Sequence, residues 1–191
     1  MIRNTALLVR DMIKQLSRLL EQLHYRILLL ERKPGTSISL SARLDIGPKL
    51  TSPKRKYHKL SLDTGAHIED RVTINTDHGA VKIGKNCAIG IGCIIIGPAD
   101  INDNVSLGPN VFICGENRKH SGTDSGLVSS HEAVTVKPVS IGKGTWVGAN
   151  AIILPGVEIG ISNIVAAGAI VSKSSSDYQL LRGTSASATS L

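Results

Sequence analysis

Three of the six histidines stand where an imidazole would be free to act as a base. His120 and His131 lie in a polar stretch between residues 114 and 140, and His78 lies in a short Asp-His-Gly segment. A neutral imidazole takes up a proton near neutral pH, and a hydroxyl group must lose a proton to become a good nucleophile. Three carboxylates near His120 in the sequence are candidates to orient its ring: Glu116, Asp124 and Glu132.

A six-residue repeat determines the elements that position these histidines. Leu, Ile or Val recurs every six residues at fifteen positions, with two interruptions, and we call these residues the hexad series. A period of six is neither that of a helix nor that of a strand, so it indicates one short unit stacked many times. The hexad series is Leu62, Ile68, Ile74, Ile83, Ile89, Ile95, Ile101, Leu107, Ile113, Ile141, Val147, Ile153, Ile159, Val165 and Val171.

The repeat predicts a thin triangular prism of parallel strands. One aliphatic side chain per hexad points into a narrow lumen, and three hexads make an 18-residue coil. Fifteen hexads therefore predict five coils, or roughly 24 Å of prism. A small residue four places later lets the wall close, at Ala66, Val72, Cys87, Cys93, Ala99, Val105, Val111, Thr145, Ala151, Val157 and Ala169. We expect the glycines directly after the hexad series to permit tight corners, including backbone angles closed to other residues: Gly84, Gly90, Gly108, Gly142, Gly148 and Gly160.

Both histidine segments are interruptions of the repeat. Ile113 and Ile141 are 28 residues apart where the repeat allows 6, so about 22 residues leave the prism as a loop over 114–140. A smaller slip of three residues between Ile74 and Ile83 contains His78. Long loops on a rigid scaffold are usually functional or disordered, so these interruptions are where we expect the chemistry.

The N-terminal third differs in charge from the rest. Residues 1–60 hold 13 Lys or Arg against 4 Asp or Glu, whereas residues 61–191 hold 9 against 11. We expect an amphipathic helix in 1–33, a basic connector with degenerate coils in 34–61, the β-helix in 62–175 and a tail in 176–191. The helix would cap the β-helix, join copies of the chain or lie on a membrane. Its apolar seam is Ala6, Val9, Ile13, Leu16, Leu20, Leu23, Ile27 and Leu30.

Composition excludes several classes of protein. No apolar run reaches the length of a membrane span, and the start lacks the pattern of a signal peptide. Cys87 and Cys93 read as buried free thiols in a reducing compartment. We expect a cytoplasmic location, with peripheral contact at the inner face of the membrane through residues 1–60 as an alternative to a merely solvated basic edge. Nucleic-acid binding is not expected, because aromatic stacking platforms are lacking.

Four segments around the long loop resemble one family of enzymes. These segments are 111–117, 137–142, 146–160 and 167–173, and they include a Trp-Val-Gly and a Leu-Pro-Gly-Val run. They are similar to the hexapeptide-repeat O-acetyltransferases that modify maltose, galactosides and capsular or exopolysaccharide sugars. The resemblance covers about two thirds of the chain and implies a left-handed parallel β-helix of hexapeptide repeats, with the N-terminal helix and the protruding loop as additions.

The resemblance also implies roles for individual residues. His120 matches the family's loop base after a two-residue insertion, Arg118-Lys119, and Trp146 would wall the acceptor or pantetheine groove. The backbone N–H groups of Gly148 and Ala149 would stabilise the oxyanion. Four residues match positions that line the coenzyme groove: Ala149, Ala167, Ser172 and Lys173. By a thinner similarity to serine O-acetyltransferases, His78 is a second site histidine, across a subunit boundary from His120.

The expected activity is transfer of an acetyl group from acetyl-CoA to a hydroxyl of a sugar or glycan intermediate, without a metal, in a homotrimer with sites between subunits. Acyl transfer to a sugar amine or to serine is the alternative within the fold. A zinc hydrolyase would have to use His78, His120 and His131, whose spacing does not match such enzymes. An inactive β-helix scaffold is the third class, and the displaced His120 motivates it.

Overall fold

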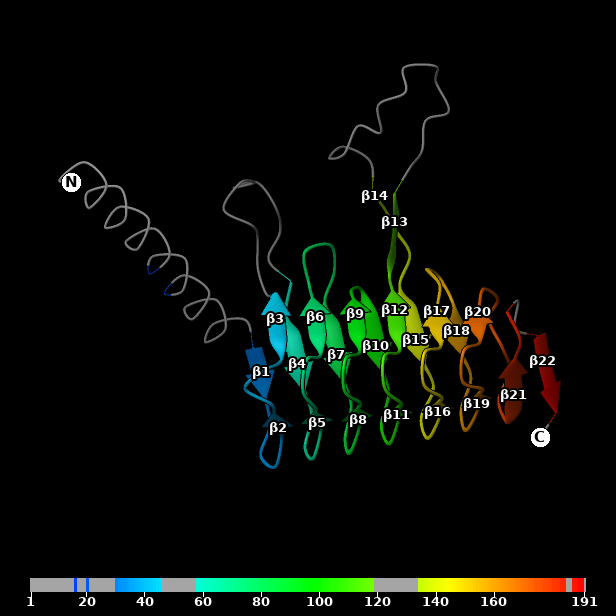
Figure 1. Cartoon of the computed structure of the whole chain (residues 1–191), viewed down its shortest axis with the longest axis horizontal. Helices are drawn as coiled ribbons and strands as arrows, with labels where there is room; N and C mark the ends of the chain where they lie inside the picture. The colour runs from blue at the N-terminus through cyan, green and yellow to red at the C-terminus, as the bar shows by residue number, and fades with distance from the viewer. Residues whose placement is uncertain are drawn as a thin grey trace, which may run out of the picture.

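The computed structural model describes residues 16, 20, 30–45, 58–118, 134–184 and 187–190, and almost all of its regular structure is short strands stacked in three sheets (Figure 1). Sheet A contains β1 (Leu30–Arg32), β4 (Leu60–Leu62), β7 (Val81–Ile83), β10 (Ala99–Ile101), β15 (Val139–Ile141) and β18 (Glu158–Ile159). Sheet B contains β2 (Ser37–Ile38), β5 (His67–Ile68), β8 (Ala88–Ile89), β11 (Ser106–Leu107), β16 (Trp146–Val147), β19 (Ile164–Val165), β21 (Gln179–Arg182) and β22 (Ser187–Ser190). Sheet C contains β3 (Arg43–Asp45), β6 (Thr73–Asn75), β9 (Ile94–Ile96), β12 (Phe112–Cys114), β17 (Ile152–Ile153) and β20 (Ile170–Val171).

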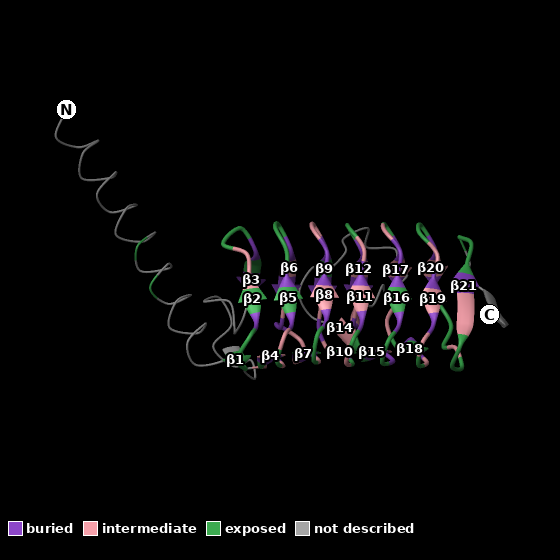
Figure 2. Ribbon diagram, turned by 90° about the horizontal axis from the view of Figure 1, so that it is seen from below, coloured by how far each residue is buried: buried purple, intermediate pink, exposed green. Residues whose placement is uncertain are grey.

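The hexad series forms the core between the three sheets. All fifteen of its residues are at most 3 % exposed, and the eleven small wall residues are at most 4 % exposed (Figure 2). Ile101 lies in register with Ile83 on one side and with Ile141 on the other, so the stack continues directly across the point where the long loop leaves. The expected all-β fold with stacked parallel strands is confirmed.

The stack begins earlier than the sequence indicated. Leu30 was expected to be the last seam residue of the helix, but it belongs to β1, which pairs with β4. Coils were expected in 34–61, and Ile38 and Leu44 do lie in register with Ile68 and Ile74. The boundary at residue 33 was wrong because Arg32 pairs with Leu62, so the first strand of that coil lies within the range expected to be helical. Of the rest of the expected helix, Leu16 and Leu20 are described and are helical. No helix within the described residues is long and apolar enough to cross a membrane.

The glycines after the hexad series have a different role from the one expected. None of these six has a positive φ; the left-handed positions fall two residues later and hold Gly, Asn or Ser. A Cβ on Gly84 would lie 2.7 Å from the backbone nitrogen of Asp103, and one on Gly148 would lie 2.5 Å from that of Ala167. These glycines are therefore required by the close approach of the next coil, not by their own backbone angles.

The C-terminal end is closed by a buried amide. Asn163 takes a small wall position and is 1 % exposed. Its side chain donates to Ser175 Oγ (2.9 Å) and to the Ser176 carbonyl (2.8 Å), and it accepts from the Gln179 N–H (2.6 Å). These bonds return the chain to sheet B, where β21 pairs with β19 and β22 pairs antiparallel with β21. Residues 176–191, expected as a tail, thus contribute two strands.

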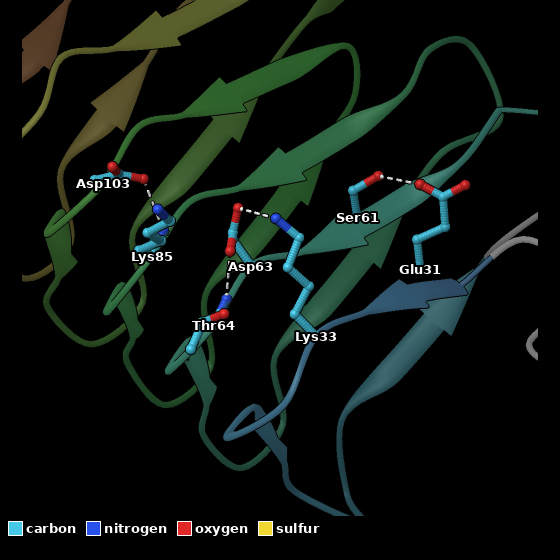
Figure 3. Close-up of polar contacts among 7 residues, drawn as sticks. All are labelled: Glu31, Lys33, Ser61, Asp63, Thr64, Lys85 and Asp103. Carbon is cyan, nitrogen blue, oxygen red and sulfur yellow. Dashed lines mark hydrogen bonds and ion pairs between the residues drawn. The ribbon is translucent and has the colours of Figure 1, made fainter.

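The outer face of sheet A near its N-terminal end carries charges of both signs (Figure 3). Lys33 Nζ lies 2.9 Å from Asp63 Oδ2, and the Lys85 N–H donates to Asp103 Oδ1 over 2.8 Å. An exposed ion pair such as Lys33–Asp63 adds little to the stability of the fold.

In the core, Cys87 and Cys93 are free and buried as predicted, and burial raises the pKa of Cys93 to about 11.

Candidate active site

Both interruptions of the repeat emerge at one edge of the prism, where sheet C turns into sheet A. The turn over 75–80 holds the short insertion, and the long insertion starts after β12, two coils further along (Figure 1). Pro98, from the coil between them, fills the space. A Cβ on Gly79 would lie 2.5 Å from Pro98 Cβ, and one on Gly115 would lie 2.7 Å from Pro98 N. We call these stacked turns the C–A edge; they bring segments distant in sequence into direct proximity.

A histidine and a carboxylate meet at the C–A edge. His78 Nδ1 contacts Glu116 Oε2, and the two side chains are 22 % and 17 % exposed. Glu116 Oε2 is buried, and within the described part of the chain it has no hydrogen-bond partner, so the ring of His78 is its polar contact. A buried carboxylate oxygen calls for a donor, and a proton on Nδ1 of His78 would supply one and leave Nε2 open. This is the tautomer of a base oriented by an acid.

The backbone around Glu116 is held on both sides. The Gly115 N–H donates to the Ile96 carbonyl (2.8 Å), and the Lys137 N–H donates to the Gly115 carbonyl (2.9 Å). The chain then enters a two-stranded antiparallel ribbon, β13 (Glu116–Arg118) and β14 (Val134–Val136), in which Glu116 pairs with Val136. The ribbon is the described root of the long loop, and it fixes the starting point of the Glu116 side chain.

The loop histidines lie outside the described residues. His120 and His131 fall there, as do Asp124 and Glu132, so their expected roles stay predictions. Glu116, which was a candidate to orient His120, has its carboxylate against His78 instead. The sequence carried a signal for this pairing, because both interruptions follow the third hexad of a coil and must therefore emerge at the same edge.

The expected coenzyme residues fall partly at another edge, where sheet B turns into sheet C. Ala149 and Ala167 occupy equivalent positions there in successive coils, and within the described residues neither N–H has an acceptor. At equivalent positions in other turns, the N–H groups of Thr64, Lys85, Ile91 and Ile161 each donate to a carboxylate oxygen at 2.6–2.8 Å. The stacked alanines therefore offer two outward donors where other turns hold an anion.

The backbone N–H of Gly148 does not fit its expected role as a donor to the oxyanion. The Gly148 N–H donates to the Val165 carbonyl (2.8 Å) as part of the stacking between coils, so it is not open to an oxyanion. Gly148 instead lets the next coil approach. Ala149 keeps the open N–H that the expectation required.

The remaining expected residues lie on different faces. Trp146 projects from the outer face of sheet B and is 49 % exposed. Ser172 and Lys173 are exposed and follow β20 at the C–A edge, on the same edge as His78. Sheet C separates that edge from Ala149 and Ala167. A single chain therefore does not bring together all the residues that the sequence assigned to one site. Within the described residues, no three His, Cys, Asp or Glu side chains gather as metal ligands.

The repeats match a family model described as the hexapeptide repeat of succinyl-transferase, over residues 80–114 and 138–173. The chain is 32 % identical to galactoside O-acetyltransferase of Escherichia coli over 97 residues, which are 49 % of this chain and 45 % of that protein. Matches to relatives from Schizosaccharomyces pombe and Mycobacterium tuberculosis likewise cover 44 % and 43 % of those proteins. The chain thus spans less than half the length of these curated relatives.

Solved structures share the fold. The N-acyltransferase AntD of Bacillus cereus, in complex with dTDP and coenzyme A, superposes with a TM-score of 0.66 at 19 % identity, covering 88 % of this chain and 87 % of that chain. Perosamine N-acetyltransferase of Caulobacter crescentus, with CoA and GDP-perosamine, gives a TM-score of 0.51 at 24 % identity, covering 90 % and 64 %.

Proposed function

We propose that the chain is an acetyltransferase of the hexapeptide-repeat group and that it transfers an acetyl group from acetyl-CoA to a hydroxyl or amino group of a sugar. The observation that carries the proposal is the pairing of His78 with Glu116 at the root of the long insertion. It supplies an oriented imidazole at an edge of the repeat scaffold, as removal of a proton from the acceptor requires.

In the reaction the imidazole accepts a proton from the hydroxyl or amino group of the acceptor. As it does so, the oxygen or nitrogen of that group bonds to the carbonyl carbon of the thioester. The carbon–sulfur bond breaks, and the sulfur leaves as the thiol of CoA after receiving a proton. The base is His120 by family resemblance, or His78 by its geometry. The two hypotheses are separable, because the residues are on different segments.

The coenzyme is proposed to lie along the stacked alanines. The open N–H groups of Ala149 and Ala167 would donate to its amide or thioester carbonyl oxygens. Trp146 would bound the groove. Ser172 and Lys173, which lie at the other edge of sheet C, would meet polar or phosphate groups of the coenzyme from the neighbouring subunit. Since His78 and the alanines flank sheet C from opposite edges, one site would take its base and its coenzyme donors from different subunits.

Replacing Ala149 by proline removes one of these donors with little other change. Pro109 and Pro155 occupy equivalent turn positions, so the fold accommodates the ring there. We expect Ala149→Pro to weaken CoA binding by roughly two- to tenfold in calorimetry, the value of about one hydrogen bond. Lys143→Pro is the matched control: it removes an open N–H at the equivalent turn between sheets A and B and should leave affinity unchanged. Equal affinity in both variants and the wild type would contradict this coenzyme site.

A homotrimer is proposed for the assembly, and the outer face of sheet C supports association. Four successive outward residues, from β9 to β20, are apolar and in register with one another: Ile94, Phe112, Ile152 and Ile170, of which Ile94 is 40 % exposed. Matching positions on sheet A hold Lys82, Asp100, Ser140 and Glu158. The left-handed sense of the coil, a cytoplasmic location and membrane contact through residues 1–60 belong to the same proposal.

The proposal includes both hydroxyl and amine acceptors because similar proteins differ in the group that they acylate. A curated relative is a galactoside O-acetyltransferase, whereas AntD was also solved with dTDP-4-amino-4,6-dideoxyglucose and coenzyme A. Thiol release from acetyl-CoA should be measured against free sugars, amino sugars, nucleotide sugars and serine. We expect release with a sugar acceptor. CoA binding without release would exclude the tested acceptors, and neither binding nor release would favour the inactive scaffold.

A further inference from the structure

The contact between Glu116 and His78 joins two separate insertions. Glu116 belongs to the root of the long insertion, and His78 belongs to a turn 38 residues earlier. Hexad stacking alone does not require either residue, since both lie outside the repeat. The side chains are nevertheless largely buried against one another, with 17 % and 22 % exposed. Two additions to the scaffold therefore complete one structural unit at the C–A edge.

The carboxylate of Glu116 is committed to this contact. Its Oε2 atom is buried and lies against Nδ1 of His78, and among the described residues it makes no hydrogen bond of normal geometry. The backbone of the preceding Gly115 is tied to Ile96 and Lys137, which fixes the point from which the side chain of Glu116 starts. Other titratable side chains on elements packed at this edge include His58, Asp77, Cys114 and Lys137. His58 contributes its carbonyl to Thr76 Oγ1 (3.2 Å), and the Asp77 N–H donates to Asn75 Oδ1 (2.7 Å).

We infer that Glu116 is a positioning residue for His78: it holds Nδ1–H, fixes the ring and leaves Nε2 as the atom that accepts the acceptor's proton. The inference rests on the proposed function and deepens it, because it selects His78 over His120 as the base. A free imidazole prefers to carry its proton on Nε2, so the reverse tautomer needs an acceptor at Nδ1. When Nε2 gains a proton, the negative charge of Glu116 stabilises the resulting cation.

A buried ion pair that only stabilised the fold would make a different prediction. Its loss would lower the melting temperature, and kcat would follow the folded fraction of the protein. A positioning role instead predicts an effect on kcat in fully folded protein and a change in the tautomer of one ring. The distinction requires a measurement on the ring itself.

The test compares the full chain with Glu116→Gln, Glu116→Asp and the control Glu158→Gln, which alters an exposed glutamate on β18. Proteins labelled with nitrogen-15 in histidine report the tautomer of His78 through the shifts of its two ring nitrogens, assigned with His78→Ala. We expect Nδ1–H in the wild type and a shift toward Nε2–H in Glu116→Gln. We expect kcat to fall at least about tenfold in that variant with the KM for acetyl-CoA within about threefold. Glu116→Asp, which keeps the charge, should restore part of the loss.

Each outcome has a defined meaning. A fall in kcat together with the change of tautomer supports the inference, whereas a fall in kcat with an unchanged tautomer, or no change in either, overturns it. If the wild type releases no thiol with any acceptor, the proposed function fails. The nitrogen-15 measurement of the His78 tautomer then tests the positioning contact by itself. In that case a tautomer that changes only in the Glu116 variants supports the positioning contact, and an unchanged tautomer overturns it.

Discussion

Replacing His78 by alanine is expected to lower kcat/KM for acyl transfer by about 10²- to 10⁴-fold, the usual contribution of a general base. The ring is the described group that combines a carboxylate at Nδ1 with a free Nε2 at the edge from which the long insertion leaves. Removing it leaves the acceptor's proton without a base, while the stacked alanines at the other edge are untouched. CoA affinity should therefore stay within about twofold, measured by calorimetry beside a thiol-release assay.

His67→Ala is the matched control for this experiment. His67 is also an imidazole on a short strand, but it is exposed on the outer face of sheet B, where its ring contacts Ser37. We expect its loss to leave kcat/KM within about threefold. His120→Ala completes the set. Full activity in His78→Ala together with a large loss in His120→Ala would move the base to the loop.

The second large effect is expected at a glycine of the core wall. A Cβ on Gly142 would overlap the backbone carbon and oxygen of Gly160 and lie 2.7 Å from the nitrogen of Ile161. Backbone cannot rotate away as a long side chain can, so Gly142→Ala must push two coils apart. We expect a loss of about 3 kcal/mol or more in the free energy of unfolding. For a chain of this size that corresponds to a melting temperature lower by roughly 6–12 °C.

The variant Gly168→Asn is the control for Gly142→Ala, because Gly168 has a left-handed backbone conformation but no crowding neighbour. Gly168 has a φ of +70°, and a Cβ there would meet no atom within 4 Å. Asparagine already occupies the equivalent left-handed position at Asn110 and Asn150, with φ of 57° and 58°. We expect this variant to lose less than about 1 kcal/mol. A melting temperature lowered equally by both substitutions would show that crowding between coils is not what Gly142 relieves.

The two interruptions of the repeat show which features of the candidate site can be predicted from the sequence. Counting hexads places both of them after the third strand of a coil, which is enough to predict a shared edge. Counting does not predict that the carboxylate of Glu116 lies against the ring of His78. That contact depends on Pro98 and Gly115, whose contacts set the path of the chain as it leaves the prism.

The glycines show the same limit in the scaffold. The sequence indicated correctly that Gly84 and its equivalents were needed, but it suggested the wrong reason. A neighbour 16 or more residues away occupies the space of the missing Cβ, and only the stacked structure reveals that neighbour. The left-handed positions, by contrast, were readable in principle, because Gly and Asn recur three residues after the hexad series.

By itself, the sequence determined the repeat, the lumen and the edges at which chemistry could be placed, because a six-residue period with one aliphatic residue per unit is a local property that stacking merely repeats. The tertiary structure decided where the stack begins, at Leu30, and which acid meets which histidine. It also decided that Gly148 is committed to the wall while Ala149 and Ala167 remain open. These features depend on contacts between coils and on the exact path of the insertions, and no short-range pattern encodes the direction of a side chain across such a contact.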